Sequence, residues 1–250
     1  MRRNMRHLAY SWALSLLAML ATTSVSQAAL VTYGFTNVTN NNITNVSIGR
    51  SQMTVDVTDD GMEEGFVEFI FRNAGPAASS ITDVYFDDGS LLGITQVENG
   101  PGTQMTIGAD PGNLPGGNAI NFHTSTSRYT IFSADSSSQG GVQPNGANPG
   151  EWFGIIFALK NSKTYDDVLA ALTLSLQPGN IGQDITGGLR IGIHVQGFAN
   201  GGSESFVNSD PVAFTSSIVP EPASMTLWAL GLVVCGGAGY WKKRRAKESA

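Results

Sequence analysis

Short runs of alternating apolar and polar residues, separated by turns rich in Gly, Asn and Asp, most constrain how this chain can fold. Residues 52–57 and 65–71 alternate cleanly, and Asp59, Asp60 and Gly61 lie between them. Alternation with a period of two is typical of a strand that buries one face. An Asp-Gly pair between two such runs predicts an antiparallel hairpin, here with a loop longer than two residues.

Six further runs rich in β-branched and aromatic residues predict strands. They cover residues 81–86, 91–97, 129–132, 151–159, 189–195 and 212–215. Charged residues make up only 14% of the chain, which excludes a coiled coil or helical bundle, and 41% hydrophobic residues suffice for a core. We therefore expect an all-β protein with a single β-sandwich or jelly-roll-like domain over residues 29–218, with long loops at 110–118 and 133–150.

One short helix is predicted within this body. Thr164 is a suitable N-cap, and the carboxylates of Asp166 and Asp167 follow in the first turn, where the helix dipole favours them. Val168 and Leu172 then recur at helical spacing. We expect this amphipathic helix to cover one edge of the sandwich.

The N-terminus has the three-part layout of a secretory signal peptide. Residues 1–7 are basic, residues 8–21 are apolar, and small polar residues follow up to Ala28. The apolar stretch is shorter than the ~20 residues of a bilayer span. We expect export by the general secretion machinery and removal of residues 1–28 by signal peptidase, between Ala28 and Ala29.

The C-terminus predicts a transmembrane helix over residues 223–241, a stretch with no charge. It is followed at once by a basic cluster, Lys242, Lys243, Arg244 and Arg245. Such clusters stay in the cytoplasm, so the body is expected on the other side of the inner membrane.

Pro220, Glu221 and Pro222 stand directly before this span, and prolines on both sides of the glutamate favour an extended, accessible peptide. The order Pro-Glu-Pro, apolar span and basic cluster resembles the PEP-CTERM sorting tail of exported bacterial proteins, here residues 219–250. The same tail is also labelled an ice-binding-protein C-terminus, which does not imply ice binding. The resemblance implies processing by an exosortase, an integral-membrane cysteine transpeptidase, and delivery to the cell surface or the exopolysaccharide matrix.

Three stretches of the body, residues 80–89, 149–152 and 191–198, resemble a body type that recurs among PEP-CTERM proteins. That resemblance implies no activity. Between residues 29 and 219 the chain has six Lys and Arg against eighteen Asp and Glu, so nucleic acid is excluded as a partner.

Residues suited to catalysis are few. The only cysteine, Cys235, lies in the predicted span, which leaves the body without a thiol nucleophile or a disulfide. An enzyme would need a pocket that pairs His123 or His194 with a carboxylate, and no Gly-x-Ser-x-Gly motif occurs. We therefore expect a non-enzymatic structural or interaction protein without a cofactor, with a secreted hydrolase as a third reading.

Carbohydrate binding is the alternative function. Two groups of turn carboxylates offer oxygen ligands for calcium, or are simply solvated acids: Asp56, Asp59 and Asp60 in one group and Asp87 and Asp88 in the other. Aromatic side chains on strand faces can stack on sugar rings, and the candidates are Trp152, Tyr85 and Tyr129. Together these residues predict a calcium-assisted carbohydrate-binding module, with exopolysaccharide as its partner.

Overall fold

A computed structural model of the chain describes residues 30–87, 91–122, 124, 133–177, 180 and 187–212. All of the described residues belong to one compact unit. The predicted signal peptide with its cleavage site, the strand at 129–132 and the sorting tail with its membrane span lie outside the described residues. Among the residues described, no helix is long and apolar enough to cross a bilayer.

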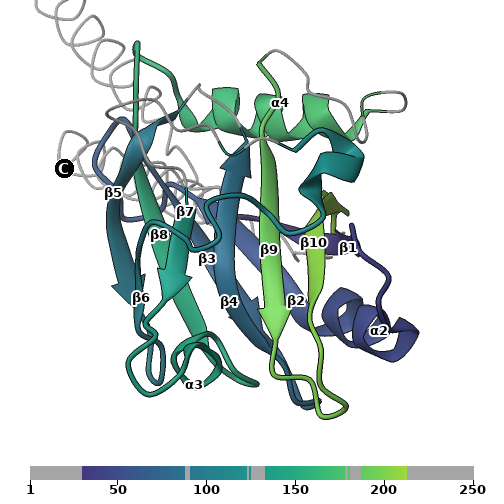
Figure 1. The fold of residues 1–250 in the computed structure, drawn as a ribbon. Helices are drawn as coiled ribbons and strands as arrows, with labels where there is room; N and C mark the ends of the chain where they lie inside the picture. The colour runs from purple at the N-terminus through teal and green to yellow at the C-terminus, as the bar shows by residue number, and fades with distance from the viewer. Residues whose placement is uncertain are drawn as a thin grey trace, which may run out of the picture. The chain divides into compact units, whose positions relative to one another are not determined.

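Ten antiparallel strands form one sheet (Figure 1), which confirms the all-β prediction. The strands are β1 Val31–Asn37, β2 Met53–Thr58, β3 Phe66–Asn73, β4 Ser80–Asp87, β5 Leu91–Asn99, β6 Met105–Ile107, β7 Ser133–Ser136, β8 Trp152–Leu159, β9 Arg190–Gln196 and β10 Glu204–Pro211. Their order in the sheet is β5-β8-β3-β2-β1-β10-β9-β4-β7-β6. The predicted hairpin is present, because β2 pairs with β3 across a loop longer than two residues.

The sheet curls so that its two halves face each other across an aromatic core. Phe86 of β4 packs edge-on against Phe69 of β3 and Phe157 of β8, with ring centroids 5.2 Å and 4.6 Å apart. β4 and these two strands are separated by several strands in the sheet order, so the contact requires one half to fold over the other. The described strands therefore form one continuous sheet that is nearly closed like a barrel, where the sequence predicts the two layers of a sandwich.

A side-chain amide joins the two edge strands of the sheet. Asn99, at the end of β5, donates from Nδ2 to the Met105 carbonyl oxygen at 3.0 Å, and the Met105 N–H of β6 donates to Asn99 Oδ1 at 2.6 Å. The amide reproduces the donor and acceptor of a backbone ladder. In this way it protects edges that would otherwise expose unpaired groups.

The predicted helix is confirmed as α4, Tyr165–Leu176. Thr164 and Asp167 form a capping box, in which each side chain bonds to the other residue's backbone N–H. Val168 and Leu172 belong to the core, and Figure 1 shows α4 lying across one end of the strands. The helix thus closes that end of the folded sheet, as the amphipathic pattern indicates.

A second helix, α2 Ile43–Gln52, corrects the expectation of a single one. Its sequence has β-branched residues and no apolar stripe, so local pattern does not predict it. Long-range contacts stabilise it instead. Gly49 lies against Phe206 of β10 so closely that a Cβ would come within 2.1 Å of the ring, and the Glu204 carboxylate accepts from the Asn42 N–H at 2.6 Å.

Of the strand expected at 212–215 only Val212 is described, and it follows the end of β10 at Pro211; residues 213–215 lie outside the described residues. The two long loops contain ordered elements: the 3-10 helix η1 Gly117–Ile120 begins in the first, and β7 and the short helix α3 Val142–Asn145 lie in the second. The sequence pattern does not predict β10, because its sequence, ESFVNSDP, is mostly polar although five of its residues are buried.

Candidate functional site

The outer face of β4, β9 and β10 carries several buried polar side chains that could do chemistry. Strand alternation sets this face. In β9, Ile191 and Ile193 pack into the core, so Arg190 and His194 lie on the opposite face. In β4, a bulge after Ile81 resets the pairing so that Asp83 lies directly opposite His194.

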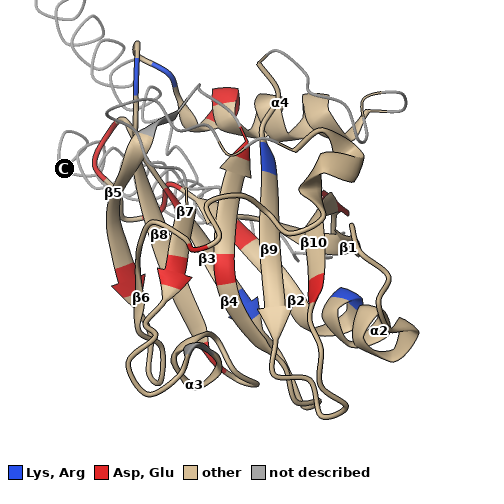
Figure 2. Cartoon of the chain, in the orientation of Figure 1, with Lys and Arg blue, Asp and Glu red and all other residues tan. Residues whose placement is uncertain are grey.

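Four polar residues form a row across neighbouring strands, and we call it the acidic row: Ser205, His194, Asp83 and Asp135. Each is the direct register partner of the next. Figure 2 shows the acidic positions of β4 and β7 at the same height in adjacent strands. His194 and Asp83, which are direct neighbours in the row, are 111 residues apart in the chain.

His194 is held by a carboxylate. Its Nδ1 lies 3.0 Å from Asp83 Oδ2, and the Thr82 hydroxyl donates to the same oxygen at 2.8 Å. His194 is 6% exposed and Asp83 3% exposed. This is the histidine–carboxylate pairing that an enzyme would require; His123, the other candidate, lies outside the described residues.

Two carboxyl groups of the row, those of Asp83 and Asp135, interact with each other. Burial, together with the charge and hydrogen bond of Asp83, raises the pKa of Asp135 to about 6. Burial and the Asp83 charge also raise the pKa of the Tyr85 hydroxyl, which donates to the Pro111 carbonyl oxygen at 2.9 Å. Near neutral pH the charge on Asp135 is therefore unfavourable in the folded chain, and protonation of Asp135 removes this unfavourable interaction.

Ser205 completes the order hydroxyl, imidazole, carboxylate. Its Oγ is buried and has no hydrogen-bond partner among the described residues. However, Ser205 is only 1% exposed, and its backbone N–H and carbonyl are bonded to residues 38 and 39, which hold β10 in place. Ser205 lines neither of the two cavities described below, so neither of them leads a substrate to this hydroxyl, and the row acts as a polar network in the sheet.

The acidic row makes stability depend on pH. The pKa of Asp135 is raised in the folded chain above its ordinary 3.8. The stabilising contribution of this group to the free energy of unfolding is therefore complete below pH 3.8 and is lost as pH rises through about 6. Asp135→Asn removes the charge, and we expect the variant to gain about 1 kcal/mol over the native chain between pH 4 and 8, a figure reduced for solvent screening. Urea unfolding across this pH range measures it.

The control for that experiment is Thr106→Val, a neighbour of Asp135 in register on β6 with no titrating group. This variant should keep the native pH profile. Parallel profiles for the native chain and Asp135→Asn would show that neither burial nor Asp83 raises the pKa of Asp135 in the folded chain.

A second feature of the same face is a covering segment, residues 109–122. Its Leu114 and Phe122 pack on β9 at Gly192, where a Cβ would lie 2.8 Å from Leu114 and 3.1 Å from Phe122. Together with Tyr85 and Val207 they form a small apolar cluster outside the main core. A side chain at position 192 would therefore push Leu114 and Phe122 away from the sheet.

Beside this segment a cavity of about 390 Å³ opens between β1, β10, η1 and the last turn of α4; we call it the β10 cavity. Three of its lining residues are buried and polar: Arg190, Ser175 and Asn208. Aliphatic side chains form another part of its wall: Ile120, Leu176 and Val207. Asp210 and Thr36 also line it, so a polar surface and an apolar surface meet in one concave site.

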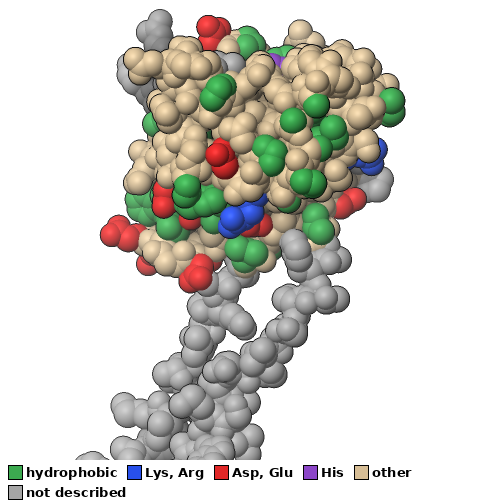
Figure 3. Space-filling view, turned by 90° about the horizontal axis from the view of Figure 1, so that it is seen from below, with side chains coloured by type: hydrophobic (Ala, Val, Ile, Leu, Met, Phe, Trp, Pro, Cys, Tyr) green, Lys and Arg blue, Asp and Glu red, His purple; other side chains and the backbone are tan. Residues whose placement is uncertain are grey.

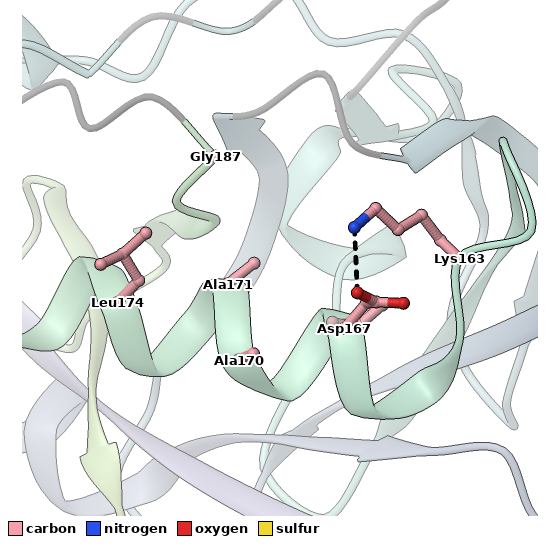
Figure 4. Close-up of a pocket in the computed structure, with 7 residues that line it drawn as sticks. Lys163, Asp167, Ala170, Ala171, Leu174 and Gly187 are labelled. Atoms are coloured by element: carbon pink, nitrogen blue, oxygen red, sulfur yellow. Dashed lines mark hydrogen bonds and ion pairs between the residues drawn. The ribbon is translucent and has the colours of Figure 1, made fainter.

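A smaller cavity of about 270 Å³ lies along α4 near Gly187 (Figure 4). Its lining is mostly aliphatic, and its charged groups, Lys163 and Asp167, are joined by an ion pair of 2.9 Å. Because that pair is exposed and satisfied, the cavity offers few groups to a ligand.

The carboxylates predicted to bind calcium do not converge. Asp56 of β2 bonds to Arg72 at 2.7 Å, and Asp87 of β4 bonds to Arg190, on a strand that is not adjacent to β2. Asp59 and Asp60 lie in the β2–β3 turn, and Asp88 lies outside the described residues. Within the described ranges, no three His, Cys, Asp or Glu side chains are grouped as metal ligands.

The three aromatic candidates for sugar stacking differ in their surroundings. Tyr85 is fully buried, so its predicted stacking role is wrong: it belongs to the small apolar cluster. The Trp152 ring packs against Gly100, where a Cβ would come within 2.9 Å of it. Tyr129 lies outside the described residues.

The exposed surface offers little apolar area for docking. Among the described residues, the large hydrophobic side chains that are exposed are Leu30, Ile43, Ile107 and Val212, which come from separate elements. Figure 3 shows one face on which hydrophobic side chains are scattered among uncharged polar ones. Scattered residues of this kind are normal for a protein surface.

Sequence reasoning missed Asn208 and Arg190 as site residues, because their roles depend on which strands become neighbours. No family model, curated protein or solved structure matches this chain. The functional argument therefore rests on the residues themselves.

Proposed function

We propose that this chain is an exported, non-enzymatic structural or interaction protein of a Gram-negative bacterium, with a β-sandwich-like body. An exosortase would process its tail at the inner membrane, and the body would then join the cell surface or the exopolysaccharide matrix. One observation carries the proposal: the C-terminal order of Pro-Glu-Pro, uncharged span and basic cluster, combined with a signal-peptide layout at the other end.

Two properties of the body support this function. It contains no cysteine, so its folding is independent of the redox state of its compartment. Its histidine–carboxylate pair is buried, and the hydroxyl beside it is inaccessible, which favours a structural role over hydrolysis.

Fractionation of cells that contain an exosortase tests the proposal. We expect the native chain to pass from a membrane-bound precursor to a shorter surface or matrix form. Glu221→Gln combined with Pro220→Ala and Pro222→Ala should leave most of the chain as the membrane precursor, because the extended recognition peptide is lost.

The control is Glu248→Gln, the same chemical change outside the motif, which should be processed like the native chain. A full-length chain in the cytosol, or equal processing of the motif variant, would overturn the proposal. Mass spectrometry of the released form identifies both of its termini.

A further inference from the structure

We infer that the β10 cavity binds a neutral sugar residue of the surrounding polysaccharide. The inference rests on the proposed function, which places the body among such polymers. It replaces the predicted aromatic and calcium sites with a different set of residues. Three properties of the cavity support it: an unsatisfied donor, a neutralised cation and an aliphatic wall.

The donor is the side-chain amide of Asn208. Its Oδ1 accepts from the Ile191 N–H at 2.8 Å, which fixes the orientation of the amide and identifies Nδ2 as the other end. Asn208 is 1% exposed, and Nδ2 has no acceptor among the described residues. An unsatisfied buried donor is unfavourable, and Asn208 lines the cavity, so a ligand hydroxyl that accepts from Nδ2 would remove that penalty.

The cation, Arg190, cannot attract an anion into the cavity. Its guanidinium bonds to Asp87, with Nε at 2.9 Å, and donates to the Ile120 and Asn121 carbonyl oxygens at 2.7 Å and 2.6 Å. Asp210 adds a carboxylate to the lining and makes no ion pair within the described residues. The charge balance therefore excludes acidic sugars and phosphates and favours a neutral ligand.

The aliphatic wall fits the apolar side of a pyranose ring. Ile120, Leu176 and Val207 supply branched side chains, while Asn37, Asn208 and Ser209 supply amide and hydroxyl groups. A volume of about 390 Å³ lies at the lower end of the range for small-molecule sites. One or two sugar units of a polymer match that size.

Binding of simple neutral sugars to the detergent-solubilised full chain tests the inference. The probes are methyl glucoside, methyl galactoside, N-acetylglucosamine and cellobiose, with glucuronic acid as the anionic comparison, measured by saturation-transfer NMR and calorimetry. We expect at least one neutral probe to bind and glucuronic acid not to bind. Thr36→Trp, which fills the cavity from β1, should weaken binding by at least about tenfold.

Thr54→Trp is the matched control, since Thr54 is a half-buried strand threonine on β2, away from the cavity. Ile120→Trp fills the cavity from the opposite wall, so a fault in the folding of one variant does not decide the result. Unchanged binding in both filling variants, binding of glucuronic acid alone, or binding of no probe would each overturn the inference. A chain that is exported and processed yet binds no probe would leave the proposed function standing, whereas a cytosolic chain would remove it.

Discussion

Phe86→Ala is expected to lower the free energy of unfolding by about 3–5 kcal/mol, the range for removing a large aromatic from a packed core. Phe86 is fully buried and is the residue of β4 that contacts the opposite half of the sheet. It packs edge-on against Phe69, Phe71 and Phe157, and these pairs add energy beyond burial alone. Its loss would leave a cavity at the contact that holds the sheet curled.

Denaturant unfolding measures this change, with Ile107→Ala as the control. Ile107 is 43% exposed on the edge strand β6, so its truncation should cost less than about 1 kcal/mol. Similar losses in the two variants would mean that the aromatic contact does not hold the two halves together.

Arg190→Met is expected to cost about 3–5 kcal/mol, because it breaks a buried ion pair by removing the guanidinium that neutralises the Asp87 carboxylate. The Arg190 and Asp87 side chains are only 5% and 10% exposed. Arg190 also satisfies two carbonyl oxygens of the covering segment and lies over the Phe122 ring, with its guanidinium carbon 5.3 Å from the centroid. Methionine keeps an unbranched apolar stem but none of these bonds.

The chain contains its own control for this experiment. Arg72 pairs with Asp56 at 2.7 Å, and the Asp56 side chain is as buried as that of Asp87, but the Arg72 side chain is 45% exposed and water can reach the pair from that side, so Arg72→Met should cost less than Arg190→Met. Urea midpoints of the two variants measured side by side test the comparison. Equal and small effects would show that the Arg190 pair does not anchor the covering segment to β9.

The Arg190→Met variant bears on function as well as on stability. The covering segment contributes Ile120 to the β10 cavity, and Arg190 holds the backbone at Ile120 through its carbonyl oxygen. If Arg190→Met remains folded, we expect the cavity wall to lose its position. The sugar site and the anchor of the segment are thus parts of one arrangement.

Local pattern accounts for much of the fold. Alternation and turn residues predict the β2–β3 hairpin, and the strands near residues 81–86, 91–97, 151–159 and 189–195 are confirmed as β4, β5, β8 and β9. Thr164 and the carboxylates after it predict α4, because capping depends on residues within one turn. Each of these signals lies within a few neighbouring residues.

The elements that local pattern missed depend on distant partners. β10 is polar in sequence, yet Glu204 is buried because it bonds to the backbone at Asn41 and Asn42, which precede α2. The helix in turn needs Phe206 beside Gly49. Neither contact can be inferred from the residues that surround each element.

The candidate sites likewise depend on contacts that local sequence does not reveal. The expected calcium and stacking residues were chosen because they are close in sequence or suitable in type, and Tyr85 proved to be buried. The acidic row and the β10 cavity instead join residues from four or more elements. Which side chains meet there follows from the strand order, in which β10 lies between β1 and β9.

The sequence by itself determined the all-β class, the capped helix and the predicted signals at both ends, because alternation, capping and hydropathy are properties of contiguous residues. Only the tertiary structure decided that the sheet is continuous and curled, that His194 pairs with Asp83 and that Asn208 lines a cavity. Those outcomes depend on contacts between residues far apart in the chain, whose energies exist only once the strands are paired.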